Sequence, residues 1–307
     1  MSRTEKYRGI FPAFYACYED DGRISGERAH AFTKYLIGKG VQGLYVGGSS
    51  GECIYQSVEE RKELLENVME AAGGKLVVIA HVACNNTKDS VELAAHAQSL
   101  GVDAIASIPP IYFHLPEYAI AEYWNAISAG APDTDFIIYN IPQLAGVSLT
   151  LPLLQKMREN PRVIGVKNSS MPVQDIQIFQ AAGSEDWVVF NGPDEQFVSG
   201  RAMGAAAGIG GTYAAMPELY LAMDRAFREG RMEDARTLQY RANEIIGALC
   251  SCRANMYAVI KELLRMDGMD IGGVRPPLVN VTREDLPKIR KCREMIDQAI
   301  SEPVCRI

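Results

Sequence analysis

Short apolar runs alternate with amphipathic stretches along most of the chain. Three joints between them look alike: at 39–46, 100–106 and 203–209 an amphipathic stretch stops at a glycine and an apolar run follows. A glycine just after a helix suits the left-handed conformation, and a continuous apolar run suits a strand buried on both faces. This alternation predicts a parallel sheet covered by helices, and therefore an α/β fold.

Eight segments have the character of such buried strands, and helical patterns lie between them. They are 9–15, 43–46, 76–80, 104–108, 136–140, 163–167, 187–191 and 206–209. This number of strand–helix units favours a (β/α)8 TIM barrel over an open doubly wound sheet.

The helical pattern that begins at Ser57 is the clearest. Ser57 and Glu60 form a capping box, and the apolar positions that follow make one face of a helix. Farther along, Asn86 or Thr87 is expected to cap a helix that Gly101 stops.

The chain continues well beyond the eighth strand. Further helices are expected near 218–229, 232–250, 253–266 and 284–300. The first of these would complete the barrel, and the others would form a C-terminal helical extension. Because no low-complexity linker interrupts the chain, we predict a single domain over 1–307, with the barrel at about 7–229 and the extension at about 230–307.

The composition is that of an ordinary globular enzyme. Of 307 residues, 48% are apolar and 22% are charged, and the formal net charge is −7. A negatively charged chain without a basic run argues against nucleic acid or an anionic membrane as a partner. No apolar stretch is long enough to span a membrane, and the N-terminus lacks a signal-peptide pattern, so we expect a cytoplasmic protein.

The cysteines give no sign of a metal site or a disulfide framework. The seven of them are scattered and odd in number, with no Cys-x-x-Cys pair and no histidine at zinc spacing. This pattern favours reduced cysteines, and we expect no metal.

Polar residues gather at the predicted carboxyl ends of the strands, where barrel enzymes hold their reactive groups. These ends are 47–52, 109–112, 139–142, 167–170 and 191–195. Lys167 is the most distinctive, because it ends an apolar strand and its stem is expected to point into the barrel mouth. A lysine there loses hydration, which lowers its pKa and supplies the neutral amine that attack on a ketone requires. The alternative is a lysine that reaches the surface or pairs with a carboxylate.

Two further strand ends carry candidate chemistry. Tyr139 ends the neighbouring strand, so its phenol is expected to lie within reach of Lys167 and to relay a proton; a buried tyrosine with a satisfied hydroxyl is the alternative. The glycines and serines of 47–52 suit a loop that binds a carboxylate or a phosphate, and a plain glycine-rich turn is equally consistent with them. A phosphate loop and a close-packed turn are likewise both open for 208–211.

Together these motifs resemble the N-acetylneuraminate lyase/dihydrodipicolinate synthase family over nearly the whole chain. The resemblance rests on Gly-Gly-Ser-Ser-Gly-Glu at 47–52, Tyr-Asn-Ile-Pro at 139–142, Gly-Val-Lys at 165–167 and the appended helices. The order and spacing of the three motifs make the match specific.

The resemblance implies a class I aldolase that forms a Schiff base with a 2-keto acid of the pyruvate type. Lys167 would form the imine, and Tyr139 would relay protons with the help of Ser49. Ser50 would join Ser49 in binding the carboxylate of the keto acid. Tyr112 would enter the site of a neighbouring subunit, which implies a homotetramer built from dimers. No metal or organic cofactor is implied, since the protonated imine serves as the electron sink.

The residues that separate the branches of the family favour the lyases. Dihydrodipicolinate synthases carry an arginine shortly after a Tyr-Asn-Val-Pro motif, and 143–146 contains none. Gly192, Asp194 and Glu195 match lyase positions that hydrogen-bond the hydroxyl-rich part of the sugar, and carboxylates suit a polyol because their oxygens accept from hydroxyls. Ser169 stands where lyases usually have a threonine near the bond that breaks. The resemblance therefore implies reversible cleavage of N-acetylneuraminate to N-acetylmannosamine and pyruvate.

Two departures from the lyase pattern bear on sugar specificity. Gly211, which we still expect to line the substrate site, stands where a well-known lyase pattern has a serine, and Pro193 replaces an aromatic residue. An aldolase for another sugar acid, such as 2-keto-3-deoxygluconate, is the first alternative, and dihydrodipicolinate synthase is the second. A non-catalytic sugar-acid sensor and a phosphosugar isomerase that uses 208–211 are alternatives from other classes.

Overall fold

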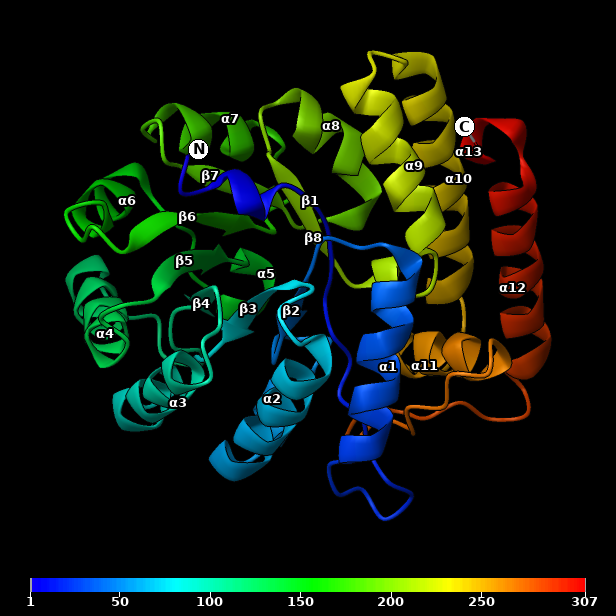
Figure 1. Cartoon of the computed structure of the whole chain (residues 1–307), viewed down its shortest axis with the longest axis horizontal. Coiled ribbons are helices and arrows are strands. Elements are labelled where there is room, and N and C mark those ends of the chain that lie inside the picture. The colour runs from blue at the N-terminus through cyan, green and yellow to red at the C-terminus, as the bar shows by residue number, and fades with distance from the viewer. Residues whose placement is uncertain (1, 307) are drawn as a thin grey trace.

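The computed structural model describes residues 2–306 and contains eight parallel strands arranged as a barrel (Figure 1). The strands are β1 (Gly9–Pro12), β2 (Gly43–Val46), β3 (Val77–His81), β4 (Ala104–Ser107), β5 (Asp135–Asn140), β6 (Val163–Asn168), β7 (Val188–Asn191) and β8 (Ala207–Gly210). They pair in the order β1-β8-β7-β6-β5-β4-β3-β2. A parallel bridge between Ala13 and Tyr45 joins the two ends of this order, so the barrel is nearly closed. The predicted (β/α)8 TIM barrel is confirmed.

The strand pattern of the sequence places all eight strands within a few residues of their observed bounds. The largest difference is at β1, which ends at Pro12 and not at Tyr15. The backbone leaves the ladder there, because the N–H of Ala13 still donates to the carbonyl of Gly210 whereas the N–H of Phe14 donates to Tyr45.

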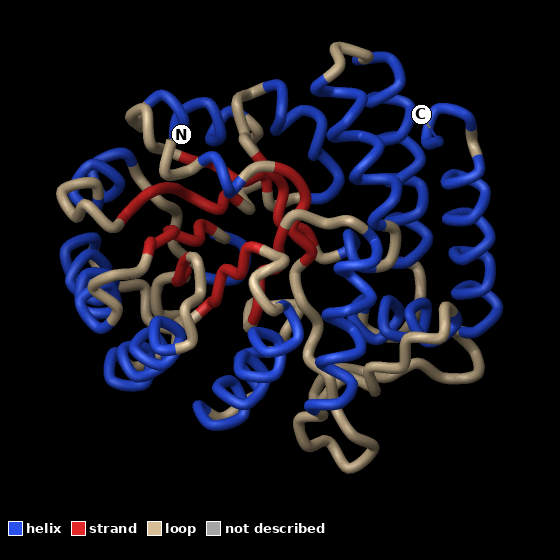
Figure 2. Tube along the Cα trace, in the orientation of Figure 1, coloured by secondary structure: helices blue, strands red, loops and turns tan. Residues whose placement is uncertain are grey.

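Helices cover the outside of the barrel (Figures 1 and 2). They are α1 (Gly26–Lys39), α2 (Val58–Ala72), α3 (Thr87–Ser99), α4 (Glu117–Gly130), α6 (Leu151–Met157), α7 (Gln174–Ala181), α8 (Phe197–Ala202) and α9 (Pro217–Arg228). The short helix α5 (Pro142–Ala145) lies instead at the carboxyl end of β5. Short 3-10 turns lie at η1 (Glu5–Tyr7), η2 (Cys53–Tyr55), η3 (Asp194–Gln196) and η4 (Thr212–Ala214). The predicted capping box of Ser57 and Glu60 begins α2, and the side chain of Asn86 caps α3.

Four helices follow the barrel: α10 (Met232–Cys250), α11 (Met256–Met266), α12 (Leu286–Ser301) and α13 (Pro303–Arg306). They lie on one side of the barrel, where α10 packs against both α9 and α12 (Figure 1). The helix expected from residue 253 begins at Met256, because the side chain of Asn255 accepts a hydrogen bond from the N–H of Tyr257 and so acts as the cap.

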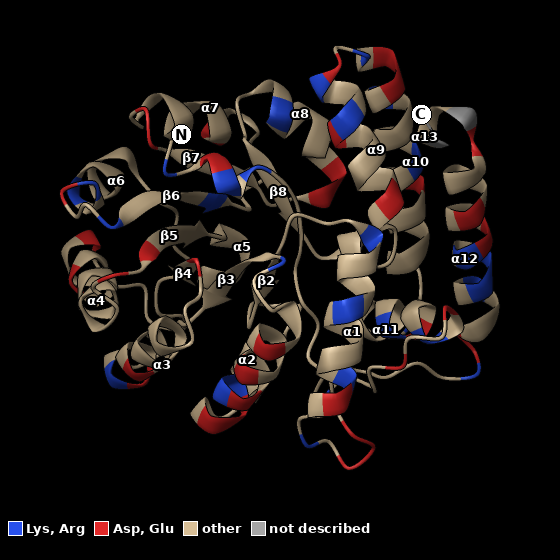
Figure 3. Ribbon diagram, in the orientation of Figure 1, with Lys and Arg blue, Asp and Glu red and all other residues tan. Residues whose placement is uncertain are grey.

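Side chains fill the barrel, and its amino end is closed. The interior cluster contains Phe11, Tyr45, Ile79, Ile137, Ile164 and Phe190. Tyr7 seals the amino end, where its hydroxyl donates to Asp135 over 2.8 Å. Charged side chains of both signs are spread over the outer helices and are sparse on the strands (Figure 3). Among residues 2–306 no helix is long and apolar enough to cross a membrane.

Candidate active site

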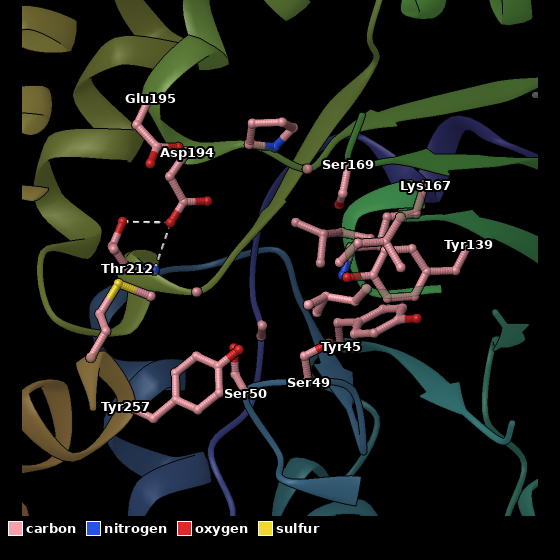
Figure 4. A pocket seen from close by; sticks show the side chains of 18 of the residues that line it. Tyr45, Ser49, Ser50, Tyr139, Lys167, Ser169, Asp194, Glu195, Thr212 and Tyr257 are labelled. Atoms are coloured by element: carbon pink, nitrogen blue, oxygen red, sulfur yellow. Dashed lines mark hydrogen bonds between the residues drawn. The ribbon is translucent and has the colours of Figure 1, made fainter. Parts of the chain in front are cut away.

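A cavity of about 210 Å³ opens at the carboxyl ends of the strands (Figure 4). Most of the site residues predicted from the sequence line this cavity. They are Ser49, Ser50, Tyr139, Lys167, Ser169, Gly192, Asp194, Glu195 and Gly211. The structure thus brings together residues from the carboxyl ends of five strands, namely β2, β5, β6, β7 and β8.

Lys167 extends from the end of β6 into this cavity and is 4% exposed. Its Nζ atom lies 3.8 Å from the centre of the Tyr139 ring and 3.9 Å from the centre of the Tyr45 ring. Burial lowers the pKa of Lys167 to about 7, although the charge of Asp194 acts in the opposite direction. A large fraction of the amine is therefore neutral near pH 7 and is able to attack a carbonyl carbon.

Tyr139 lies beside Lys167 because the two residues are paired across the β5–β6 ladder. Burial raises the pKa of Tyr139, while hydrogen bonding to Ser169 and Ser49 partly offsets this effect. The phenol is therefore neutral. A neutral phenol transfers protons only by accepting one at its oxygen as it donates its own, and two serine hydroxyls are at hand for that exchange.

The loop 47–52 leads from β2 into the cavity, and its glycines are required by its shape. Gly47 has a φ of 75°, which favours glycine. A side chain at Gly48 would collide with the ring of Tyr45. Buried His81 fixes the loop, because its Nδ1 donates to the carbonyl of Gly47 over 2.8 Å; its pKa is lowered to about 3, mainly by burial, so the ring is neutral.

The geometry of 47–52 suits an anion. Within residues 2–306, no backbone carbonyl accepts a hydrogen bond from the N–H groups of Ser49 and Ser50. Both hydroxyls also line the cavity. Free N–H and O–H donors in one loop are what a carboxylate requires.

The other glycine-rich segment, 208–211, is close-packed: residues 208–210 belong to β8, and Gly211 follows the strand. A side chain at Gly208 would collide with Tyr213, and one at Gly210 would collide with the carboxylate of Asp194. That carboxylate would repel a phosphate, so the structure gives no support to a phosphate loop here.

Asp194 presents a carboxylate to the cavity opposite Lys167 (Figure 4). Its Oδ2 accepts from the N–H of Thr212 over 2.7 Å and from the hydroxyl of Thr212 over 2.6 Å. Burial raises the pKa of Asp194 to about 6, although the two bonds from Thr212 favour the charged form. With one oxygen held in this way, the other is free to accept from a ligand hydroxyl.

Two neighbours of Asp194 complete this side of the cavity. Glu195 is exposed at the rim and lines the opening. Gly192 lies against Ser169, and a side chain at Gly192 would collide with the Ser169 hydroxyl and the Asn168 carbonyl. Only glycine leaves the Ser169 hydroxyl in its position beside Tyr139.

Tyr112 is the one predicted site residue that does not line the cavity. It lies on the loop after β4 with a φ of 82° and is 86% exposed. Its ring packs edge-on against Phe113, which is 69% exposed, with 5.0 Å between the ring centres. The prediction that Tyr112 enters a neighbouring subunit remains a prediction.

Several cavity residues were not predicted from the sequence: Tyr45, Thr212, Met256 and Tyr257. Tyr45 lies inside β2, and the period of its strand identifies an inward position without saying what it touches. Met256 and Tyr257 come from α11, and a helical pattern does not reveal where an appended helix docks. Among the described residues, no group of three or more His, Cys, Asp or Glu side chains has an arrangement that would hold a metal ion.

The model of the dihydrodipicolinate synthetase family matches residues 6–296. The chain belongs to this family. It is 63% identical to the N-acetylneuraminate lyase of Mediterraneibacter gnavus, over 97% of this chain and 95% of that protein. It also resembles the structure of a wild-type sialic acid aldolase from Ruminococcus gnavus, with a TM-score of 0.95, 64% identity, and coverage of 96% of this chain and 98% of that one. An N-acetylneuraminate lyase from Proteus mirabilis has a TM-score of 0.88 at 28% identity, covering 95% of this chain and 98% of that one.

The two residues that depart from the lyase pattern, Pro193 and Gly211, both border the cavity. A Cβ atom at Gly211 would lie 3.3 Å from Oγ of Ser50 and 3.7 Å from the hydroxyl of Tyr15. Pro193 is buried between Gly192 and Asp194. The segment 143–146, where dihydrodipicolinate synthases are expected to carry an arginine, contains no cationic side chain, and its Leu144 borders the cavity.

Proposed function

We propose that this protein is an N-acetylneuraminate lyase, a class I aldolase that reversibly cleaves N-acetylneuraminate to N-acetylmannosamine and pyruvate. The observation that carries the proposal is the Lys167 amine, buried at the barrel mouth with a pKa of about 7. The 63% identity to the N-acetylneuraminate lyase of Mediterraneibacter gnavus supports the choice of substrate. A protein that only binds sugar acids has no use for a desolvated amine.

The reaction begins at Lys167. The neutral amine adds to the C2 ketone of the open-chain sugar acid, and loss of water with uptake of one proton from solvent gives a protonated imine. The positive charge then lies between the rings of Tyr45 and Tyr139, whose faces stabilise a cation. This imine withdraws electrons from the C3–C4 bond, so no metal or organic cofactor is needed.

Cleavage requires that the C4 hydroxyl lose its proton as the C3–C4 bond breaks. The Tyr139 oxygen accepts this proton as its own passes to Ser49, and the Ser49 hydrogen moves on to the substrate carboxylate beside it; Ser169 is the second hydroxyl beside the phenol. The amino sugar leaves as an aldehyde, and the same relay runs in reverse to return the proton through Tyr139 to C3 of the enamine on Lys167. Hydrolysis of the resulting imine frees pyruvate and restores the amine.

The two ends of the cavity suit the two ends of the substrate. The free N–H groups and hydroxyls of Ser49 and Ser50 suit the carboxylate next to C2. Asp194, Glu195 and the backbone at Gly192 suit the hydroxyl-rich end, since carboxylates and carbonyls accept from hydroxyls. The absence of an arginine at 143–146 disfavours a substrate with a second carboxylate, as in dihydrodipicolinate synthase.

We also propose that the enzyme is a homotetramer in which Tyr112 reaches the site of a neighbouring subunit. Two large aromatic side chains, Tyr112 and Phe113, are exposed on one loop, and exposed aromatic residues are enriched at interfaces. Light scattering on the purified protein tests the assembly. A monomer at micromolar concentration would contradict it.

The function is tested by measuring pyruvate released from N-acetylneuraminate and, separately, from 2-keto-3-deoxygluconate. We expect release from N-acetylneuraminate. Release from the other acid alone would keep the imine chemistry but overturn the assignment of Asp194 and Glu195 to the sialic acid polyol. No release from either would favour a binding protein.

A further inference from the structure

Helix α11 is attached to the loop 47–52 by a buried ion pair. Nζ of Lys261 lies 2.8 Å from Oε1 of Glu52, and the two side chains are 1% and 0% exposed. The second carboxylate oxygen of Glu52 accepts from the backbone N–H of Arg275 over 2.8 Å. Because both oxygens of Glu52 are held by the C-terminal region, the loop and α11 are positioned as one unit.

This attachment sets the place of Tyr257. Tyr257 and Lys261 are four residues apart on α11, so they lie on the same face of the helix, one turn from each other. Lys261 contacts Glu52, and Tyr257 extends from the same face of the helix toward Ser50, two residues earlier in the loop. Figure 4 shows the Tyr257 hydroxyl beside the Ser50 hydroxyl at the edge of the cavity.

A second tyrosine, Tyr15, lies next to Tyr257 and Ser50. Tyr15 is fully buried, and its ring is edge-on to that of Tyr257 with 5.8 Å between the centres. Burial raises the pKa of both tyrosines, to about 12 for Tyr257, and hydrogen bonding to Ser50 acts against burial in both cases. A Cβ atom at Gly211 would lie close to both the Ser50 and the Tyr15 hydroxyls, so with glycine there no side chain stands between the two.

The hydrogen-bond donors and acceptors around Ser50 decide which way its hydroxyl hydrogen points. The Tyr15 hydroxyl donates its only hydrogen to the carbonyl of Gly211 over 2.9 Å, so its oxygen has only acceptor capacity left. The Tyr257 hydroxyl has no such fixed acceptor among the described residues, and its hydrogen is available to Ser50. If Tyr257 did not donate, the Ser50 hydrogen would have the Tyr15 oxygen as a competing acceptor.

We propose that Tyr257 is a positioning residue for the carboxylate of the keto acid: it donates to Oγ of Ser50 and so keeps the Ser50 hydrogen directed into the cavity. This proposal rests on the proposed function, because it takes the loop 47–52 to hold the carboxylate. It makes α11, a helix outside the barrel, part of the substrate site. The keto acid end of the ligand is affected, and the amino sugar end is not.

The test is the kinetics of the condensation reaction for Tyr257→Phe, which removes one hydroxyl and keeps the ring. Losing a hydrogen bond that supports a charged group costs roughly tenfold in affinity. We expect KM for pyruvate to rise by roughly that factor, with KM for N-acetylmannosamine within about twofold of the wild type. Tyr240→Phe, the same change at a tyrosine that is 60% exposed on α10, is the matched control and should leave both constants unchanged.

A double-mutant cycle shows whether Tyr257 acts through Ser50. If it does, Tyr257→Phe has little further effect once Ser50 is replaced by alanine. Additive effects of the two changes, or a rise in KM for N-acetylmannosamine in place of pyruvate, would overturn the proposal.

Borohydride trapping of the pyruvate imine at varied pyruvate concentration gives the same information without an amino sugar. It separates this proposal from the proposed function: a wild-type protein that traps pyruvate but does not cleave N-acetylneuraminate would contradict only the latter. An unchanged half-saturating pyruvate concentration in Tyr257→Phe would contradict the role of Tyr257.

Discussion

Nζ of Lys167 lies 3.8 Å from the centre of the Tyr139 ring, and the two residues face each other across neighbouring strands. This relationship places the proposed nucleophile and the proposed proton relay at the same register of two neighbouring strands. The Tyr45 ring lies on the amine at a nearly equal distance, 3.9 Å. Burial by the two rings favours the neutral amine, and in the proposed mechanism their faces would stabilise the cationic imine.

The contribution of Tyr45 is predicted to come from its ring and not from its hydroxyl, which is buried without a hydrogen-bond partner among residues 2–306. A desolvated cation–π contact is worth about 2 kcal/mol, or roughly thirtyfold in rate. Tyr45→Leu should therefore lower kcat for pyruvate release by about that factor. Tyr45→Phe, the matched control, should stay within roughly threefold of the wild type. Equal losses in the two variants would show that the hydroxyl matters.

The pH profile should reflect the lowered pKa of Lys167. Only the neutral amine attacks, so kcat/KM for N-acetylneuraminate should rise with pH, reach half its maximum near pH 7 and level off above it. Protonation of Asp194, whose pKa is about 6, should steepen the fall on the acid side. An activity that begins to rise only near pH 10 would mean that the amine has the pKa of an ordinary lysine.

The barrel was predictable from the sequence because buried parallel strands are continuous apolar runs and each is preceded by a helix with a visible stop. The position of Lys167 followed from the same pattern, since it ends such a run. The pairing of Tyr139 with Lys167 could be predicted because both residues end their strands and β5 and β6 are neighbours in the barrel. These are local signals or consequences of strand order.

The remaining parts of the site depend on docking between distant segments. Tyr257 reaches the cavity because Lys261 pairs with Glu52, 209 positions away in the chain. Thr212 fixes Asp194 through a turn whose shape the sequence does not disclose. Neither relationship has a periodic pattern in a single sequence. The proposed role of Tyr112 would depend on a second chain, which a single sequence does not describe.

Asp194 should bind the amino sugar. With one oxygen held by Thr212, Asp194→Asn keeps the size of the side chain but removes a charged acceptor. We expect KM for N-acetylmannosamine in the condensation reaction to rise roughly tenfold, with KM for pyruvate unchanged. Asp133→Asn, at a carboxylate that is 83% exposed, is the control. A larger effect on pyruvate than on the amino sugar would place Asp194 at the wrong end of the substrate.

The ion pair between Lys261 and Glu52 should be important for stability. Lys261→Met leaves a carboxylate that is 0% exposed without its partner, which typically costs 3–5 kcal/mol, so roughly that loss in unfolding free energy is expected. Arg265→Met, one turn farther along α11 at a side chain that is 56% exposed, should change it by less than about 1 kcal/mol. Urea denaturation measures both. Similar stability of the two variants would mean that Glu52 does not depend on Lys261 as its partner.

The most direct test of the central claim is to identify the residue that pyruvate modifies. The protein is mixed with pyruvate and borohydride, digested, and the peptides are examined by mass spectrometry. One reduced pyruvate adduct is expected, on Lys167, and Lys167→Ala should give neither adduct nor pyruvate release from N-acetylneuraminate. An adduct on another lysine, or substantial turnover by Lys167→Ala, would contradict the imine mechanism at this site.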